Sequence, residues 1–432
     1  MIRPRAALLV LLVAVAAGAL TLTAGPIPLP VGGRVRAAPA SARDSCTNCH
    51  DGLGGRLAVP AENIPYDAHT RSELRCAGCH GGDPTRVGMD AHDPAAGFRG
   101  KPRYEQIPQF CGRCHGDPAF MRRFNPSLPT DQLARYLTSQ HGQRLAKGDL
   151  RVAVCISCHG VHPVRPVNEG TSPVFSTNVP ATCARCHSDT ARMKPYGIPT
   201  TQFAEYRESV HGQGLLRRGN RQAPACNDCH GNHGAAPPGV ASVANVCAQC
   251  HSATRDLFVR SPHKRAFDTL GMAECTVCHG THNIAFPTDV MLGQEKGSAC
   301  LQCHSAGTAG LNAAVGMRGS LEEVKGAITQ AEGVLKRASS AGMDVTDARL
   351  DLDEATSQLI RARAVTHTAN PPEVQKVTAV GITAAGRARA AGEAALAELV
   401  FRRRGLGVSV AVIAFVAVLL WLKLRELKRT SG

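Results

Sequence analysis

One pentapeptide pattern, Cys-x-x-Cys-His, occurs nine times in this chain of 432 residues. The nine copies use all 18 cysteines and leave none over. Their cysteines are Cys46 and Cys49, Cys76 and Cys79, Cys111 and Cys114, Cys155 and Cys158, Cys183 and Cys186, Cys226 and Cys229, Cys247 and Cys250, Cys275 and Cys278, and Cys300 and Cys303. The histidines that end the copies are His50, His80, His115, His159, His187, His230, His251, His279 and His304. The segment 46–304 is therefore organised around one repeated chemical unit.

This spacing is the attachment pattern of c-type haem. Two thiols add to the two vinyl groups of one porphyrin, and the adjacent imidazole becomes the proximal ligand of the iron. A disulfide framework would not require a histidine after every second cysteine. Zinc sites would pair the Cys-x-x-Cys units into tetrahedral centres, and an odd number of copies does not divide into pairs. The pattern predicts nine covalently bound haem c groups.

The chain has 18 histidines, so nine remain after the proximal ligands are assigned. These spare histidines are His69, His92, His141, His162, His211, His233, His263, His282 and His367. A haem that only carries electrons takes a second axial ligand, and imidazole is a common one. The equal numbers predict that every iron has two histidine ligands. The alternative for any single one, above all His367, is an ordinary surface histidine.

The fold class follows from how little chain each attachment motif has. Between residues 46 and 304 the chain spends only roughly 29 residues per motif, too few for a conventional core around each cofactor. We expect loops and short helices wrapped around stacked haems, with little or no β structure. An aromatic content of 4% and 43 glycines agree with this, because tight turns at haem edges favour glycine. The net charge of +15 would neutralise haem propionates, so we expect no nucleic-acid partner.

The haem region also contains an internal repeat. In its clear form, a Ser-x-His element precedes Cys-x-x-Cys-His-Gly-x-His, and a plain attachment motif follows. The clear copies begin at Ser139, Ser209 and Ser261. A looser copy comes first, and its spare histidine His92 stands well beyond His80. Each copy holds two attachment motifs and two spare histidines, which predicts that each is self-sufficient in ligands. His50 and His367 are left over, which favours a tie between the N-terminal haem, or a partner reshuffled with it, and the C-terminal segment.

These alternating elements resemble those of the class III multihaem cytochromes c, over about residues 46–304. The resemblance implies parallel-stacked and perpendicular haem pairs at near-contact distance, bis-histidine ligation and a role in electron transfer. The first copy departs from the family pattern, because His92 does not lie three residues after His80.

Beyond residue 304 cysteine is absent and helix-forming residues dominate. Apolar residues spaced by three and four predict amphipathic helices over 321–338, about 346–368 and about 372–403. We expect a three-helix antiparallel bundle over 317–404, with a flexible stalk as the alternative. His367, near the end of the second helix, is expected to be a distal haem ligand, with Arg361 or Arg363 meeting a propionate. Such a ligand would place one haem near the bilayer.

Two apolar segments point to a membrane. Residues 1–42 carry Arg3 and Arg5, then an apolar run, then small residues, which predicts a secretory signal peptide or an uncleaved anchor. Residues 405–422 are uncharged, which predicts a transmembrane helix rather than a buried one, with 423–432 as a cytoplasmic tail. Haem c is attached on the exported side. We therefore expect a periplasmic haem domain, 43–310, held at the inner membrane by one C-terminal span.

Taken together, these features predict a relay of electrons in a respiratory chain, with no catalytic residues of its own. The expected partners are membrane lipid, a quinol-linked membrane protein of the cytochrome b type, and periplasmic or outer-membrane cytochromes. The main alternative is a multihaem reductase or dehydrogenase acting on nitrogen or sulfur oxyanions. Such an enzyme needs an iron with an open position, and the histidine count leaves none. A polymerising cytochrome filament is a third reading, which a membrane helix disfavours.

Overall fold

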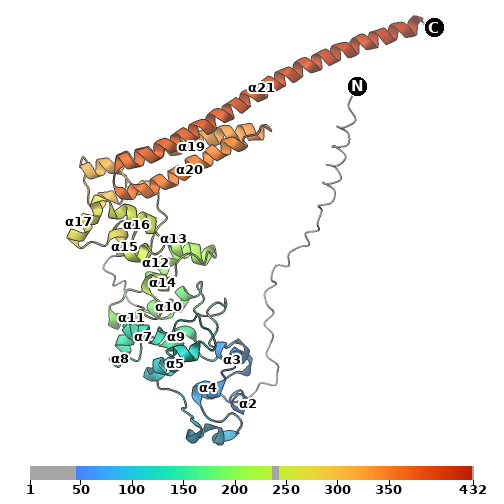
Figure 1. Ribbon diagram of the computed structural model, residues 1–432. Helices are drawn as coiled ribbons and strands as arrows, with labels where there is room; N and C mark the ends of the chain where they lie inside the picture. Colours follow the sequence, from blue (N-terminus) through green and yellow to red (C-terminus); the bar gives the residue numbers. More distant parts are fainter. Residues whose placement is uncertain (1–44, 236–242, 431–432) are drawn as a thin grey trace, which may run out of the picture. The chain divides into compact units, whose positions relative to one another are not determined.

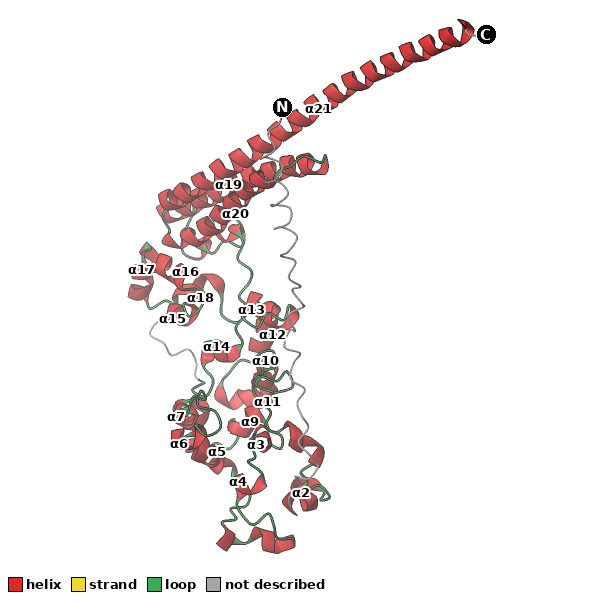
Figure 2. Cartoon of the chain, turned by 45° about the vertical axis from the view of Figure 1, so that its right-hand side comes forward, coloured by secondary structure: helices red, strands yellow, loops and turns green. Residues whose placement is uncertain are grey.

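The computed structural model describes residues 45–235 and 243–430. Within those two ranges the chain forms helices, turns and loops and no strand (Figure 2). The predicted fold class is therefore confirmed, while the predicted signal segment 1–42 lies outside the described residues. The chain divides into two compact units. The first holds residues up to Lys101 together with His162–Val164, and the second holds Pro102–Val161 and everything from Arg165 onward.

The first unit is built from very short helices. They are α2 (Ser45–His50), η2 (Gly55–Leu57), η3 (Ala61–Tyr66), α3 (Ala68–Arg71), α4 (Cys76–His80), η4 (Gly88–His92) and η5 (Pro94–Ala96). Helices this short contain few internal hydrogen bonds, and capping by side chains helps to stabilise them. The carboxylate of Asp67 accepts hydrogen bonds from the backbone N–H groups of His69 and Thr70, which starts α3.

The haem-motif part of the second unit continues this pattern. Its helices are η6 (Tyr104–Gln106), α5 (Ile107–His115), α6 (Pro118–Met121), α7 (Gln132–Thr138), α8 (Gln140–Ala146), α9 (Cys155–His159), α10 (Val179–His187), α11 (Thr190–Met193), η7 (Lys194–Tyr196), α12 (Gln202–Glu208), α13 (Val210–Gly212), η8 (Gln213–Arg217), α14 (Cys226–His230), α15 (Val243–Cys247), α16 (Ser252–Val259), α17 (Pro262–Leu270), α18 (Glu274–His279), η9 (Asp289–Met291) and η10 (Cys300–Gln302).

The glycine of the Cys-x-x-Cys-His-Gly element ends its helix. Gly81, Gly160, Gly231 and Gly280 follow the attachment histidines of α4, α9, α14 and α18, and all four have φ between 71° and 84°. A side chain is strained in this region of backbone space, whereas glycine is not. The repeat therefore specifies one short helical turn that presents its histidine and then stops.

Three long helices follow, packed side by side (Figure 1). They are α19 (Ala309–Ser340), α20 (Thr346–Val365) and α21 (Pro371–Thr430), with the 3-10 turn η11 (Thr366–Thr368) before the last. One buried cluster joins the start of α19, the end of α20 and the start of α21. A second joins the end of α19, the start of α20 and a later part of α21. The helices therefore run up, down and up, as an antiparallel three-helix bundle.

The structure differs from the sequence-based expectation at both ends of this bundle. The first helix begins at Ala309 rather than near Leu321. The third helix and the predicted span are one continuous helix of 60 residues, with no break between Arg404 and Gly405. Among the described helices, α21 is the one long and apolar enough to cross a membrane by length and composition, and its most apolar stretch is fully exposed.

Candidate haem-binding sites

Among the described residues, eight attachment histidines each face one spare histidine, ring to ring. The pairs, with the distances between ring centroids, are His50–His92 (6.0 Å), His80–His162 (6.1 Å), His141–His187 (6.2 Å), His159–His233 (6.1 Å), His211–His251 (6.3 Å), His230–His282 (6.0 Å), His263–His304 (6.1 Å) and His279–His367 (6.1 Å). Every pair joins a proximal candidate to a distal one.

This separation fits two imidazoles bound to one iron. A bond from a metal to an imidazole nitrogen is about 2.0–2.1 Å, and the ring centroid lies roughly 1.1 Å behind that nitrogen, so two rings across one metal have centroids about 6.2 Å apart. The observed values lie between 6.0 and 6.3 Å. All 18 cysteines lie in the attachment motifs that carry these proximal histidines. The donor set and its spacing therefore fit bis-histidine haem c.

Several imidazoles are held in place by a hydrogen bond from one ring nitrogen to the backbone. The Nδ1 atoms hydrogen-bond to backbone carbonyls in His50 (Leu57, 2.8 Å), His80 (Gly100, 3.0 Å), His92 (Gly88, 3.1 Å) and His367 (Ala364, 2.9 Å). Because the carbonyl accepts, Nδ1 carries the proton and Nε2 keeps the lone pair. Such a hydrogen bond fixes the ring of a metal ligand and raises its basicity.

Burial keeps many of these rings neutral, as iron ligation requires. It lowers the pKa of eight of them below the ordinary value of 6.5, in most cases with a further contribution from the facing or a neighbouring imidazole. These are His141, His162, His187, His211, His233, His263, His279 and His282.

The pairing follows a rule that the sequence did not reveal. In three copies of the repeat, the first spare histidine faces the last attachment histidine of the same copy, as in His141–His187, His211–His251 and His263–His304. The other pairs cross from one copy to the next. His159 faces His233, and His230 faces His282. The expectation that each copy is self-sufficient in ligands is therefore wrong for these motifs.

The ends of the series obey the same crossing rule. His50 faces His92 in the first copy, and His279 in the last copy faces His367 beyond the repeat. A direct tie between the N-terminal haem motif and His367 is therefore wrong, and the reshuffled alternative holds instead, with His367 facing the attachment histidine His279. His367 lies in η11, between α20 and α21, and not inside the second helix.

The ligand roles of all these histidines stay predictions, and those of His69 and His115 rest on the histidine count alone. His115 ends α5, and His69 lies in α3 with its Nδ1 3.3 Å from the carboxylate of Asp67. The ninth site therefore depends on the count of histidines in the sequence.

The Ser-x-His-Gly element positions the first spare histidine of a copy. Ser139 Oγ donates a hydrogen bond to the carbonyl of Tyr136 and accepts one from the N–H of Gly142, 3.0 Å away, which starts the helix that carries His141. Ser209 makes the same two bonds to Tyr206 and Gly212 before His211. In both copies a Cβ on the glycine would collide with the tyrosine carbonyl.

Tyrosines fix these elements to the attachment motifs, and sequence reasoning did not single them out. Tyr136 Oη donates to the carbonyl of Ala153, two residues before Cys155. Tyr206 Oη donates to the carbonyl of Pro224, two residues before Cys226. The recurring Tyr-x-x-Ser-x-His spacing was the available signal. In the third copy Phe258 takes the place of the tyrosine.

Successive attachment motifs of the second unit lie against one another. The helices that carry these motifs pack against one another in the pairs α5–α9, α10–α14 and α15–α18, and this brings the first cysteines together in the pairs Cys111–Cys155, Cys183–Cys226 and Cys247–Cys275. Between these pairs, Cys158 is within electrostatic range of Cys183, Cys229 of Cys247, and Cys278 of Cys300. Seven attachment motifs thus follow one another in space in the order of the sequence.

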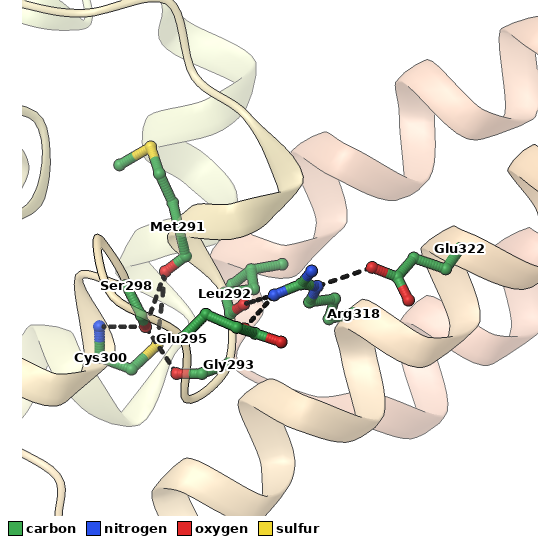
Figure 3. Close-up of polar contacts among 8 residues, drawn as sticks. All are labelled: Met291, Leu292, Gly293, Glu295, Ser298, Cys300, Arg318 and Glu322. Carbon is green, nitrogen blue, oxygen red and sulfur yellow. Dashed lines mark hydrogen bonds and ion pairs between the residues drawn. The ribbon is translucent and has the colours of Figure 1, made fainter.

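The bundle is fastened to the last attachment motif through Arg318 of α19 (Figure 3). Its guanidinium pairs with Glu322 of its own helix, and with Glu295 and the carbonyl of Leu292 in the preceding loop. In that loop Ser298 Oγ donates to the carbonyl of Gly293 (2.6 Å) and accepts from the N–H of Cys300 (3.2 Å). The position of this haem motif is therefore coupled to α19.

Two segments of the chain match known families of cytochromes. Residues 218–305 match the family described as cytochrome c3, and residues 172–252 match the one described as cytochrome c7 and related cytochrome c. Both matches indicate a multihaem cytochrome c. Neither a curated protein nor a solved structure gave a match. The matches over residues 172–305 support a multihaem cytochrome that binds haem c and transfers electrons.

Haem, when bound, supplies one-electron redox chemistry, and the protein supplies ligation, orientation and environment. In this chain the cysteine pairs would hold the porphyrin and the facing imidazoles would hold the iron. The ring planes of a pair are nearly parallel in His159–His233 (4°), His230–His282 (12°) and His279–His367 (19°). In the other five described pairs they are inclined by 33° to 64°.

Proposed function

We propose that this protein is a membrane-anchored nonahaem cytochrome c that relays electrons and has no substrate site of its own. The observation that carries the proposal is the facing of two imidazoles, 6.0–6.3 Å apart, at each of the eight described sites. Two imidazoles fill both axial positions of an iron, so no position is open for a substrate. A reductase of nitrogen or sulfur oxyanions needs such an opening.

The order of the motifs supports a relay through the second unit. Neighbouring attachment motifs lie in contact or within electrostatic range from Cys111 to Cys300. Closely spaced centres permit tunnelling from one to the next. The protein's own contribution is to fix that spacing, keep the imidazoles neutral and limit their exposure to water.

The anchor in this proposal is the apolar part of α21, residues 405–422. Its 18 residues would span about 27 Å as a helix, close to the thickness of a bilayer core. The haem segment 43–310 would face the periplasm of an inner membrane, and residues 423–432 the cytoplasm. The proposed partners are a quinol-linked membrane protein of the cytochrome b type as donor, and periplasmic or outer-membrane cytochromes as acceptors.

Carbon monoxide tests the relay against the enzyme. Reduced haem with an open axial position binds this gas, and haem with two bound imidazoles does not. The purified, fully haemylated protein should show no spectral change under carbon monoxide beyond a few per cent of its haem. Binding by one haem in nine would instead identify an active site of the reductase kind.

A further inference from the structure

The distance between the last haem site and the membrane is set by one helix. His367 lies in η11, which ends at Thr368, and α21 begins three residues later at Pro371. This helix runs without a break to Thr430. The apolar run starts at Gly405, so 34 residues of helix, about 51 Å at 1.5 Å per residue, separate the start of α21 from that run.

The His279–His367 site is held at the far end of this helix. His367 faces His279 at 6.1 Å. Arg363, one turn earlier, makes two hydrogen bonds of 2.8 Å to the carboxylate of Asp289 in η9. Leu257 of α16 packs on the buried cluster formed by this end of the bundle. Together these contacts tie the last haem motifs to the junction of α20 and α21.

The helix is supported along most of this length. Val374, Ala384 and Ala385 of α21 are buried in one cluster with α19 and α20. Ala388 is buried in the second cluster, with Ala395 and Leu396 packed against it. A single unsupported stretch of roughly two turns then leads to Gly405. Packing along most of its length makes the bundle a rigid element and not a flexible linker.

We propose that the bundle is a spacer that holds the His279–His367 site roughly 40–50 Å outside the bilayer. The lower value allows for a helix tilt of up to about 40°. Electron tunnelling falls exponentially with distance, so a quinone within the bilayer lies out of reach of this site. The haem that His367 serves therefore exchanges electrons with a redox domain that projects from the membrane.

This inference rests on the proposed anchor and corrects the expectation that His367 places a haem near the bilayer. It narrows the class of partner at this end of the array. The partner is a protein that carries a one-electron redox centre in an extramembrane domain. A membrane-embedded cytochrome b without such a domain does not fit.

The test is the height of the haem-dense region above the bilayer. The full-length, haemylated protein is placed in lipid nanodiscs and imaged by electron cryomicroscopy. We expect haem density attached to the bundle to begin roughly 40 Å or more from the headgroups, at the end of an unbroken helix. Haem density on the bundle within about one helix diameter, roughly 10 Å, of the headgroups would overturn the spacer. Failure to enter nanodiscs at all would overturn the anchor, and with it the proposed function.

Two insertions make the test sharper. Six residues of Gly and Ser placed after Phe401, between the bundle and the span, should broaden the distribution of heights and tilts. The same insertion after Arg425, beyond the span, should leave both unchanged. Equal distributions in the two variants would mean that α21 does not set the height. The double variant Gly405→Ala, Gly407→Ala should keep the parental height. A change in it would mean that the helix bends there.

Discussion

Small residues beside the imidazoles determine how closely the surrounding chain approaches each haem site. Gly142 and Gly212 leave room for the tyrosine carbonyls that hold the Ser-x-His elements. Gly310, in the first turn of α19, leaves room for the ring of His304, because a Cβ there would lie 2.5 Å from His304 Nδ1. Because glycine has no Cβ, these positions leave space for a carbonyl or an imidazole beside the haem site. Substitution of these glycines therefore tests the geometry of the sites directly.

Gly310→Ala should disturb the haem held by His304, although alanine favours a helix over glycine by about 1 kcal/mol. The added methyl group occupies the space of the imidazole, so we expect a shift in the electron paramagnetic resonance signal or reduction potential of one haem. Gly316→Ala is the matched control, since a Cβ at Gly316 meets no atom within 4 Å. Identical spectra in both variants would mean that α19 does not press on this site.

His367→Ala should convert one haem in nine to a high-spin or substitute-ligated form without loss of haem. The reason is that His367 faces His279, 6.1 Å away, and its Nδ1 bonds to the carbonyl of Ala364. Added imidazole should restore the low-spin spectrum by filling the vacant position. A variant with the parental spectrum before any imidazole is added would show that His367 is a surface histidine.

At the scale of whole elements, the bundle depends on close approach between helices. Gly381 of α21 faces α19 and α20, where a Cβ would lie 2.9 Å from Val324 Cγ2 and 3.2 Å from Gln358 Cβ. Gly386, farther along the same helix, has open space around it. A substitution at Gly381 therefore changes both core packing and helix propensity, whereas the same substitution at Gly386 changes helix propensity alone.

Gly381→Leu should destabilise the bundle by about 1–3 kcal/mol or more, the usual cost of overpacking a core. Gly386→Leu should be neutral or slightly stabilising, because leucine is the better helix former. Denaturant unfolding followed by far-ultraviolet circular dichroism measures both. Equal stability of the two variants would contradict the packing of α21 between its neighbours.

The contact between η9 and α20 should weaken in acid. Hydrogen bonds from Arg363 hold the pKa of Asp289 below its usual 3.8 in the folded protein. A lowered pKa stabilises the folded form above the unfolded value, and this stabilisation is lost as the pH falls through the folded value. We expect a loss of at most about 1 kcal/mol, because the guanidinium is partly exposed.

Asp289→Asn measures that contribution. The parent should lose stability relative to the variant as the pH falls from about 5 to below the usual carboxyl pKa, as followed by thermal unfolding. Arg363→Gln should behave like Asp289→Asn. A constant difference between parent and variant across this range would mean that the ion pair does not contribute.

The sequence predicts features that depend on local residue patterns, and it does not predict features that depend on which distant segments pack together. The attachment motifs and the apolar seam at Leu321, Val324 and Ile328 are local patterns, and local chemistry decides them. The pairing of His159 with His233 depends on which copies of the repeat pack together, and spacing alone does not record it. The continuity of α21 was hidden for another reason. The arginines before Gly405 separate a charged stretch of sequence from an apolar one, and the helix continues through this boundary without ending.

At the scale of the whole chain, several of the facing histidine pairs join two different copies of the repeat. A bound iron at each crossing pair would fasten one copy of the repeat to the next, as at His159–His233 and His230–His282. The last such pair, His279–His367, would fasten the repeat to the bundle. Loss of one crossing ligand should therefore affect the fold of two copies. Loss of a ligand within a copy, such as His211, should affect one.

Quantitative electron paramagnetic resonance of the fully oxidised protein, with haem content fixed by intact mass, tests whether every iron has two histidine ligands. We expect nine haems per chain, all low-spin with two imidazole ligands. We also expect two classes of signal, because some ring pairs are within 19° of parallel and others are inclined by 33° or more. Fewer than nine haems, or a high-spin signal equal to one or more haems per chain, would contradict this expectation.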